Sequence, residues 1–248
     1  MGLVSNNIVI SNLQVQPNIK EFISSESLII ANFGTVGNYY GLPPGTQVGD
    51  LMFAVYAQSP SGGSWTVPLG WTELFDVFGI SFGISFRVAQ PGDQIASFTW
   101  TSTEQGGVSG LLAPISFLHL SFRNVVLDNY GSFSAAVSGN STITVPGVTT
   151  TTFNTIILLF IISSEAFRAP STPSGFTLRA QTVSQQTAPE RPSVFVYMRD
   201  EPGIVVTPGN AFTNFSDSIG THIGVQIALK YGEYNSGGGG GDPGGGGP

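Results

Sequence analysis

The hydrophobic and polar positions of this chain follow the pattern of short β-strands separated by turns. Runs of about five to nine residues rich in Val, Ile, Phe, Tyr and Thr are bounded by Gly, Pro, Asn or Ser, which is typical of strands. No stretch holds a convincing 3.6-residue apolar period, so we expect almost no helix. The expected strands are residues 27–33, 50–58, 72–78, 83–89, 95–101 and 111–122, then 141–145, 155–163, 177–183, 193–199, 204–206, 211–215 and 219–230.

Two of these strands predict which sheet faces are covered. Residues 155–162 are almost continuously apolar and too few to span a membrane, which predicts a strand buried on both faces. In residues 83–89, apolar side chains alternate with Ser85 and Arg87, which predicts one buried face and one wet face.

The apolar runs occur twice in the same order. Residues 48–74 align with residues 153–179 without a gap, at an offset of 105 positions, and both contain a Pro-x-Gly turn followed by an aromatic residue. Such a repeat is longer than the roughly 20–50 residues of solenoid or propeller units, so it indicates duplication of a whole sheet-forming unit. Two further pairs of segments align in the same order: residues 86–92 with 197–203, and residues 111–117 with 224–229.

The strand pattern without interleaved helices predicts an all-β fold, an antiparallel β-sandwich or jelly roll built from two internally repeated halves. The connection between the halves has no Pro-rich or charged linker, which favours one packed sandwich over two sandwiches in tandem. The expected divisions are an extended N-terminal arm (1–26), the first half (27–124), a connection (125–140), the second half (141–232) and a glycine-rich tail (233–248).

The composition of the chain excludes several classes of partner and of chemistry. Charged residues are only 9% of the chain, and its 8 Lys and Arg residues form no basic cluster against a net charge of −7, which argues against nucleic-acid binding. No apolar run is long enough to span a membrane as a helix, and the N-terminus lacks the pattern of a cleaved leader. The absence of cysteine excludes disulfides and thiolate metal sites.

The aromatic residues fall into two groups. Trp71 and Phe176 occupy matched places in the repeat, and we expect each to plug one end of its half-core. Tyr39, Tyr40 and Trp65 instead lie among Gly, Ser and Pro in expected loops, where exposed aromatics are typical of a glycan- or protein-binding surface. The alternative is that these loop aromatics fold back onto the sandwich.

The carboxylates give no convincing acid–base pair. Glu73 and Asp76 are expected on opposite faces of a regular strand, and Asp50 is expected to bond the amides of its own turn. Two distant carboxylates could still meet in a glycosidase arrangement, and an all-oxygen calcium site near Asp128 and Asn129 stays open.

The only two histidines, His119 and His222, lie in alternating strand patterns outside any known catalytic motif. We therefore expect no catalytic residue, no metal ligand among the histidines and no cofactor.

The chain resembles the β-sandwich modules of tail-fibre, adhesin and decoration proteins of tailed bacteriophages, over residues 27–231. The glycine-rich tail also resembles the glycine-rich segments of phage adhesins. The motifs that carry the resemblance are VGDLM (48–52), PLGWT (68–72), FRVA (86–89), PGD (91–93) and SFTW (97–100), with an echo in PSGFT (173–177) and QIALK (226–230).

This resemblance implies a non-enzymatic structural virion protein, a tail fibre or adhesin component that assembles symmetrically and presents loops for host attachment. It implies assembly in the host cytoplasm, release in an extracellular particle, and partners that are other virion proteins, copies of itself and host surface glycan. Capsid decoration is the first alternative. A surface polysaccharide depolymerase and a bacterial carbohydrate-binding module are alternatives of another class.

Overall fold

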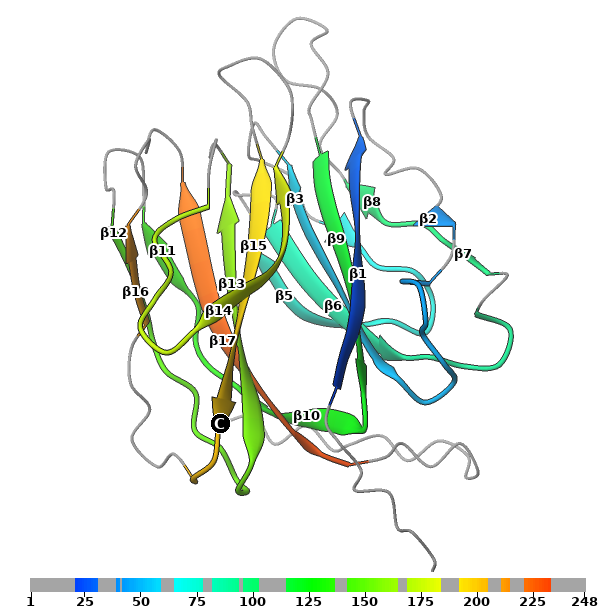
Figure 1. Cartoon of the computed structure of the whole chain (residues 1–248). Helices are drawn as coiled ribbons and strands as arrows, with labels where there is room; N and C mark the ends of the chain where they lie inside the picture. The colour runs from blue at the N-terminus through cyan, green and yellow to red at the C-terminus, as the bar shows by residue number, and fades with distance from the viewer. Residues whose placement is uncertain are drawn as a thin grey trace, which may run out of the picture.

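The computed structural model describes residues 21–30, 39–40, 42–58, 65–77, 82–93, 96–102, 115–136, 142–164, 169–183, 192–204, 211–214 and 221–232. These residues form β-strands and turns and no α-helix, as the strand pattern predicted (Figure 1). The strands are β1 (Glu21–Ile30), β2 (Tyr39–Tyr40), β3 (Leu51–Gln58), β4 (Trp65–Thr66), β5 (Thr72–Val77), β6 (Phe82–Val88), β7 (Ser97–Phe98), β8 (Thr101–Ser102), β9 (Ile115–Arg123), β10 (Val125–Tyr130), β11 (Ser134–Ala136), β12 (Thr142–Val145), β13 (Thr155–Ser163), β14 (Thr177–Val183), β15 (Ser193–Glu201), β16 (Ala211–Asn214) and β17 (His222–Tyr231).

Two antiparallel sheets face each other and share one strand order. The first sheet runs β1-β9-β3-β6-β5, and the second runs β10-β17-β13-β15-β14, with β11 also paired to β17. Numbered along the chain within each sheet, both orders read first, fifth, second, fourth, third. We refer to residues 21–123 as the first half and residues 125–232 as the second half.

The registers of the two sheets agree strand by strand. A β-bulge interrupts β1 between Phe22 and Ser24, and β10 carries one at the matched place, between Leu127 and Asn129. Likewise β5 and β14 are each bulged two residues into the strand. Because a bulge is a position-specific feature of a strand, this agreement is far more specific than a common strand order.

The halves pack against each other through one core. The inner faces of both sheets contribute to a single apolar cluster, in which Phe53 of β3 lies 5.9 Å from Phe160 of β13 between ring centroids. On one side of the sandwich β1 packs against β14, and on the other Phe75 of β5 contacts Tyr130 of β10. Since β1 matches β10 and β5 matches β14, the halves are related by an approximate two-fold axis, the arrangement of an isologous dimer. Of the two arrangements left open by the sequence, the packed sandwich is observed.

Each sheet is also covered on its outer face. In the first half, Trp65, Trp71, Phe98 and Trp100 pack over the outer side chains of β3 and β9. In the second half, Ile143 and Val145 of the β12–β16 pair, together with other apolar residues, cover the outer side of β13. All nine residues of β13 are therefore buried, as its apolar run predicted.

Three expectations need correction. The outer face of β6 is not wet, because the aromatic layer buries Ser85 completely. The sheets also begin earlier than expected: β1 includes residues 21–26 of the expected arm, and β10 and β11 lie in the expected connection. Finally, the strand registers match Phe86 with Met198 and Phe117 with Gly224, so the sequence alignments of residues 86–92 with 197–203 and of residues 111–117 with 224–229 were both out of register.

Candidate functional site

The two ends of the sandwich differ in character. Strand termini from both sheets meet at one end, shown by pairings such as Ala57–Phe82, Gln58–Ile115 and Ser163–His222. We call this the loop end. The chain segments that leave these strands, residues 59–64, 78–81, 184–191 and 215–220, lie outside the described residues, and their sequences are SPSGGS, FGIS, SQQTAPER and FSDSIG.

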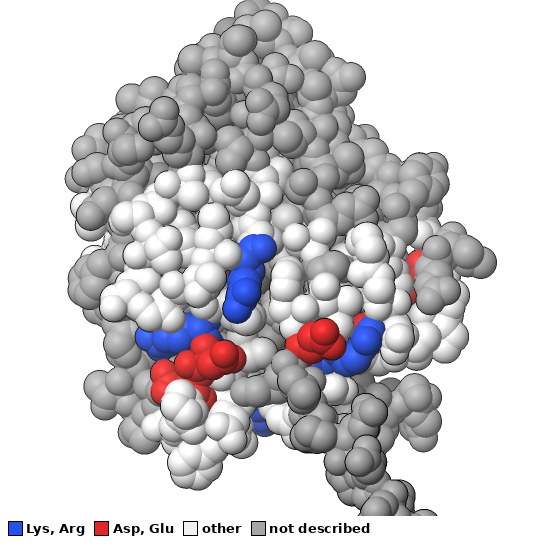
Figure 2. Space-filling view, viewed as in Figure 1, with Lys and Arg blue, Asp and Glu red and all other residues white. Residues whose placement is uncertain are grey.

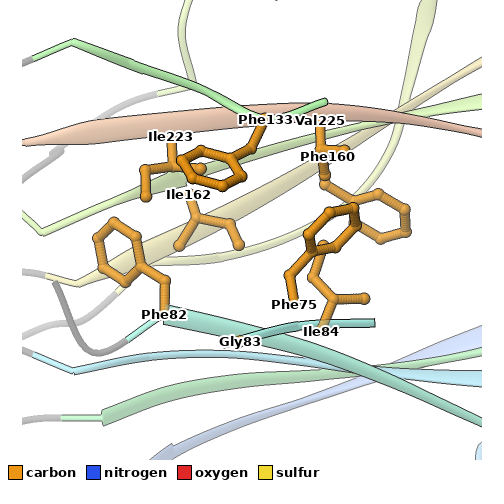
Figure 3. A pocket seen from close by; sticks show the side chains of 9 residues that line it. All are labelled: Phe75, Phe82, Gly83, Ile84, Phe133, Phe160, Ile162, Ile223 and Val225. Carbon is orange, nitrogen blue, oxygen red and sulfur yellow. The ribbon is translucent and has the colours of Figure 1, made fainter. Parts of the chain in front are cut away.

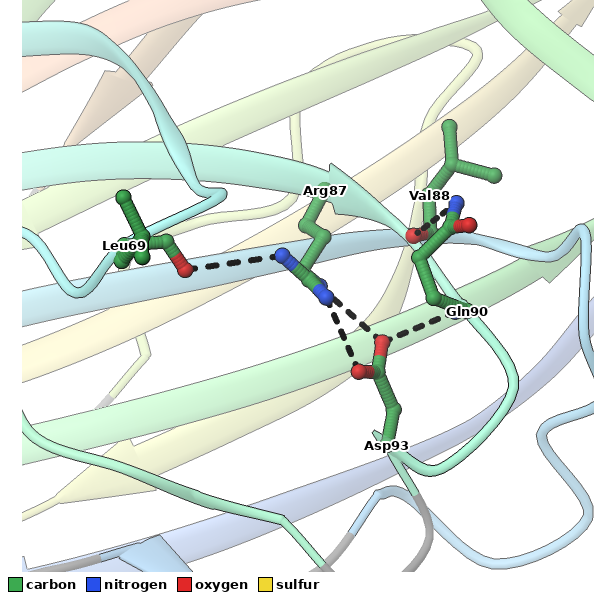
Figure 4. Close-up of polar contacts among 5 residues, drawn as sticks. All are labelled: Leu69, Arg87, Val88, Gln90 and Asp93. Atoms are coloured by element: carbon green, nitrogen blue, oxygen red, sulfur yellow. Dashed lines mark hydrogen bonds and ion pairs between the residues drawn. The ribbon is translucent and has the colours of Figure 1, made fainter. Parts of the chain in front are cut away.

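The opposite end, which we call the turn end, is built from short turns and ion pairs. Arg87 at the end of β6 forms a two-bond ion pair with Asp93, with N–O distances of 2.9 and 3.0 Å (Figure 4). Its match in register, Arg199 of β15, pairs with Glu201 at 3.5 Å. In Figure 2, acidic and basic side chains lie next to each other toward the lower part of the described surface.

A second matched pair of cations lies beside the first. Arg123 at the end of β9 binds both carboxylate oxygens of Asp50, at 3.0 and 2.9 Å. The residue matched to Arg123 is Lys230 of β17, which pairs with Asp128 at 3.2 Å. Asp50 also accepts the backbone N–H of Gln47 at 2.7 Å, so its expected role in its own turn is confirmed.

The two aromatic plugs lie where the sequence placed them. Trp71 is 6% exposed and Phe176 is 8% exposed, and each follows a glycine with a positive φ in its Pro-x-Gly turn. Trp71 makes edge contacts with Trp100, with centroids 5.0 Å apart. The guanidinium of Arg199 lies 4.8 Å over the Phe176 ring, a cation–π geometry. The expected core role of both aromatics is confirmed.

Of the three candidate binding aromatics, only the side chain of Trp65 lies in the described part of the chain. Trp65 is only 4% exposed and packs on Tyr56, with ring centroids 4.6 Å apart, so its prediction as an exposed loop aromatic is wrong. It folds back because β4 pairs with β8 over the outer face of the first sheet. The backbones of Tyr39 and Tyr40 form β2 and pair with β7, and their side chains lie outside the described residues. A binding role for those two tyrosines stays a prediction.

The acidic pair of β5 is the feature that sequence reasoning missed. The bulge in β5 places Glu73 opposite Ser85 and Asp76 opposite Gly83. Ser85 and Gly83 are two residues apart in β6, so they share one face, and Glu73 and Asp76 therefore lie on the same face. The expectation of opposite faces is wrong. The adjacent apolar residues between the two acids were the available signal, since they break strict alternation.

This acidic pair lies beside a buried phenol. Tyr56 is paired with Gly83 from the other side, and a Cβ on Gly83 would stand 2.0 Å from the Tyr56 ring and 2.6 Å from its hydroxyl. The ring therefore lies across Gly83 toward β5. Burial raises the pKa of Tyr56, and the charges of Glu73 and Asp76 raise it further. Burial also raises the pKa of the carboxyl groups of Glu73 and Asp76. The negative charge of Asp76 raises the pKa of Glu73 further.

Both histidines are core residues. Burial lowers the pKa of His119 to about 3, and its ring packs 5.4 Å from that of Trp71. The Nδ1 atom of His222 lies 2.9 Å from the hydroxyl of Ser163. Neither position favours proton transfer with a substrate, because each ring is fully buried.

An apolar pocket lies at one side of the sandwich, between the sheets (Figure 3). Phe75, Phe82 and Ile84 reach it from the first half, and Phe133 approaches from the second half. Its lining has no polar surface, so it offers shape and hydrophobic contact but no directional group.

Comparison with known proteins gives no relative: no family model, curated protein or solved structure matches this chain. Among the described residues, no three of His, Cys, Asp and Glu gather as metal ligands. That part of the chain also holds no helix of the length and apolar character required to cross a membrane.

Proposed function

We propose that this chain is a non-enzymatic structural protein of a tailed-bacteriophage virion, a tail fibre or adhesin component that contacts the host surface through its loop end. Its fold is a duplicated jelly-roll-like unit whose halves pack as an internal dimer. The partners are other virion proteins, further copies of the chain and a glycan or protein of the host envelope. This proposal is supported by the difference between the two ends, together with the motifs that resemble phage sandwich modules.

The difference between the ends carries the proposal. At the turn end, four ion pairs hold cations that stand at matched places of the two halves, and two of the acids, Asp50 and Asp93, are nearly buried. The segments that leave the loop end are rich in Ser and Gly. Binding loops on a rigid β scaffold are a recurrent way to recognise varied surfaces, because loops tolerate change that the scaffold does not.

The proposed attachment is tested by two measurements on the same protein. Antibody labelling of particles that contain the chain should place it on the distal tail, and fluorescently labelled protein should bind host cells. Replacing residues 184–191 with an equal length of alternating Gly and Ser should abolish cell binding, whereas the turn-end substitution Leu69→Ser, at a 98% exposed side chain, should not.

Three outcomes would overturn this assignment. Labelling over the capsid lattice would show a decoration protein, and absence from particles would remove the virion role. Glycan hydrolysis by the purified chain, lost on replacing its carboxylates, would make it a depolymerase.

A further inference from the structure

The outer face of the first sheet gathers four oxygen-bearing side chains at the loop end. Tyr56 and Asp76 flank Gly83 in one cross-strand row, and Glu73 lies opposite Ser85 in the next row on the same face. Asp76 is one residue from the end of β5. Glu73 is exposed, so the cluster opens to solvent at the sheet edge.

Two oxygen atoms of this cluster are buried without a hydrogen bond of ordinary geometry. The Tyr56 side chain is fully buried, and its hydroxyl, which lies over Gly83, interacts with the Ser85 hydroxyl of the same cluster but makes no hydrogen bond of ordinary geometry among the described residues. Oδ1 of Asp76 is likewise buried without a hydrogen bond in that part of the chain. Oδ2 of the same carboxylate accepts the backbone N–H of Trp65 at 3.2 Å, which fixes its orientation. Buried polar atoms left in this way cost free energy unless a ligand or water satisfies them.

The second half shows that the fold does not require these oxygens. The matched rows there are Ile161, Phe195 and Gln181, then Leu159, Tyr197 and Leu178, on an identically bulged strand. Gln181 replaces Asp76, and Leu178 replaces Glu73. The hydroxyl of Tyr197 donates to the backbone oxygen of Pro170 at 2.9 Å, so it is satisfied within the protein. The same scaffold is therefore built without an acidic pair, and the pair in the first half needs another explanation.

We propose that Glu73, Asp76 and the hydroxyls of Tyr56 and Ser85 form a binding site for a hard divalent cation of the Ca²⁺ class. Carboxylate and hydroxyl oxygens are the ligands such cations take, with water completing the shell on the open side. The cluster offers no sulfur and no imidazole, which softer metals prefer. A bound cation would neutralise two neighbouring carboxylates and satisfy both buried oxygens. It would also tie the exposed edge strand β5 to β3 at the loop end.

With only two carboxylates, the affinity should fall in the range of extracellular modules, with Kd of about 10⁻⁴–10⁻³ M. Stabilisation by 10 mM CaCl₂ at such a Kd should raise Tm by about 3–7 °C relative to EDTA. Terbium gives a second readout, because Trp65 and Tyr56 lie close enough to the site to sensitise its luminescence. Calcium should displace terbium with the same Kd.

The variants distinguish a site from general ion effects. E73Q/D76N and E73L/D76Q, the second carrying the residues of the second half, should lose both the Tm rise and the terbium signal. D200N, at an exposed acid of the turn end, should keep both. In EDTA the double variants should be at least as stable as the parent chain, because they remove the repulsion between two carboxylates on one face of β5. An equal calcium response in the parent and in E73Q/D76N, or no terbium signal in the parent, would overturn the proposal.

Discussion

Truncating Phe160 in the second half should destabilise the first half as well. Phe160 is fully buried in the core that both sheets share, 5.9 Å from Phe53 of the opposite half. Replacing a buried phenylalanine by alanine removes its apolar contacts and leaves a cavity, which costs about 3–5 kcal/mol. Since a domain is typically stable by about 5–15 kcal/mol, Phe160→Ala should remove a large share of the total. With a urea m value of about 3 kcal/mol/M, the midpoint should fall by about 1–1.7 M.

The chain carries its own reporter for this experiment. Its three tryptophans, Trp65, Trp71 and Trp100, are all buried and all in the first half. If the halves unfold as one unit, tryptophan fluorescence and far-UV circular dichroism should report the same lowered midpoint. Phe153→Ala, at a 66% exposed phenylalanine of the second half, should shift neither by more than about 0.2 M. A tryptophan transition that stays at its original midpoint in Phe160→Ala would show independent halves and refute the shared core.

Three further outcomes follow from single contacts. Asp50→Asn should lower the free energy of unfolding, measured in urea, by about 2 kcal/mol, because it breaks the two-bond ion pair with the partly exposed Arg123. An unchanged urea midpoint would show that the ion pair adds no stability. Burial keeps His119 neutral in the fold, with its pKa lowered from 6.5 to about 3, so its contribution is complete above pH 6.5 and is lost as the pH falls toward 3. His119→Gln should flatten that part of the Tm profile, and a profile parallel to the parent's would contradict this. Gly83→Ala should cost about 1–3 kcal/mol by forcing the Tyr56 ring to move, and Tyr56→Ala in the same chain should relieve that added cost in a double-mutant cycle.

The sequence predicted the fold class and the plugs because both depend on local patterns. The alternation of apolar and polar residues, together with the turn residues between the runs, predicts strands. The recurring Pro-x-Gly-aromatic motif identified Trp71 and Phe176 as equivalent core positions. The packing of both sheets on one core was favoured by the absence of a linker between the halves, whereas the strand order was not predicted, because pairing between strands distant in sequence leaves little local signal. The predicted strand positions were correct for the long central strands; β1 begins before its predicted strand, and β2, β4, β10 and β11 were not predicted.

Sequence reasoning failed where tertiary structure overrides alternation. One extra residue in β5 reversed the relative faces of Glu73 and Asp76, because a bulge shifts every later side chain to the other face. Trp65 was misplaced for a different reason: its neighbours Ser and Gly are typical of a loop, but β4 pairs with a strand more than thirty residues away. Long-range pairing of a two-residue strand leaves almost no local signal.

The two halves together act as an internal comparison that separates structural from functional positions. Features needed for folding should persist in both halves, and the matched bulges, the plugs and the cations Arg87 and Arg199 do persist. Features serving a task of one half should differ, and the acidic row of β5 is replaced by Leu178 and Gln181 in β14. The outer cover differs as well, since Leu178 packs against the apolar cluster over the second sheet, whereas Glu73 is exposed at the edge of the first. The ion-paired cations at the turn end are therefore common to both halves, and the acidic row belongs to the first half alone, where we propose that it serves the cation site.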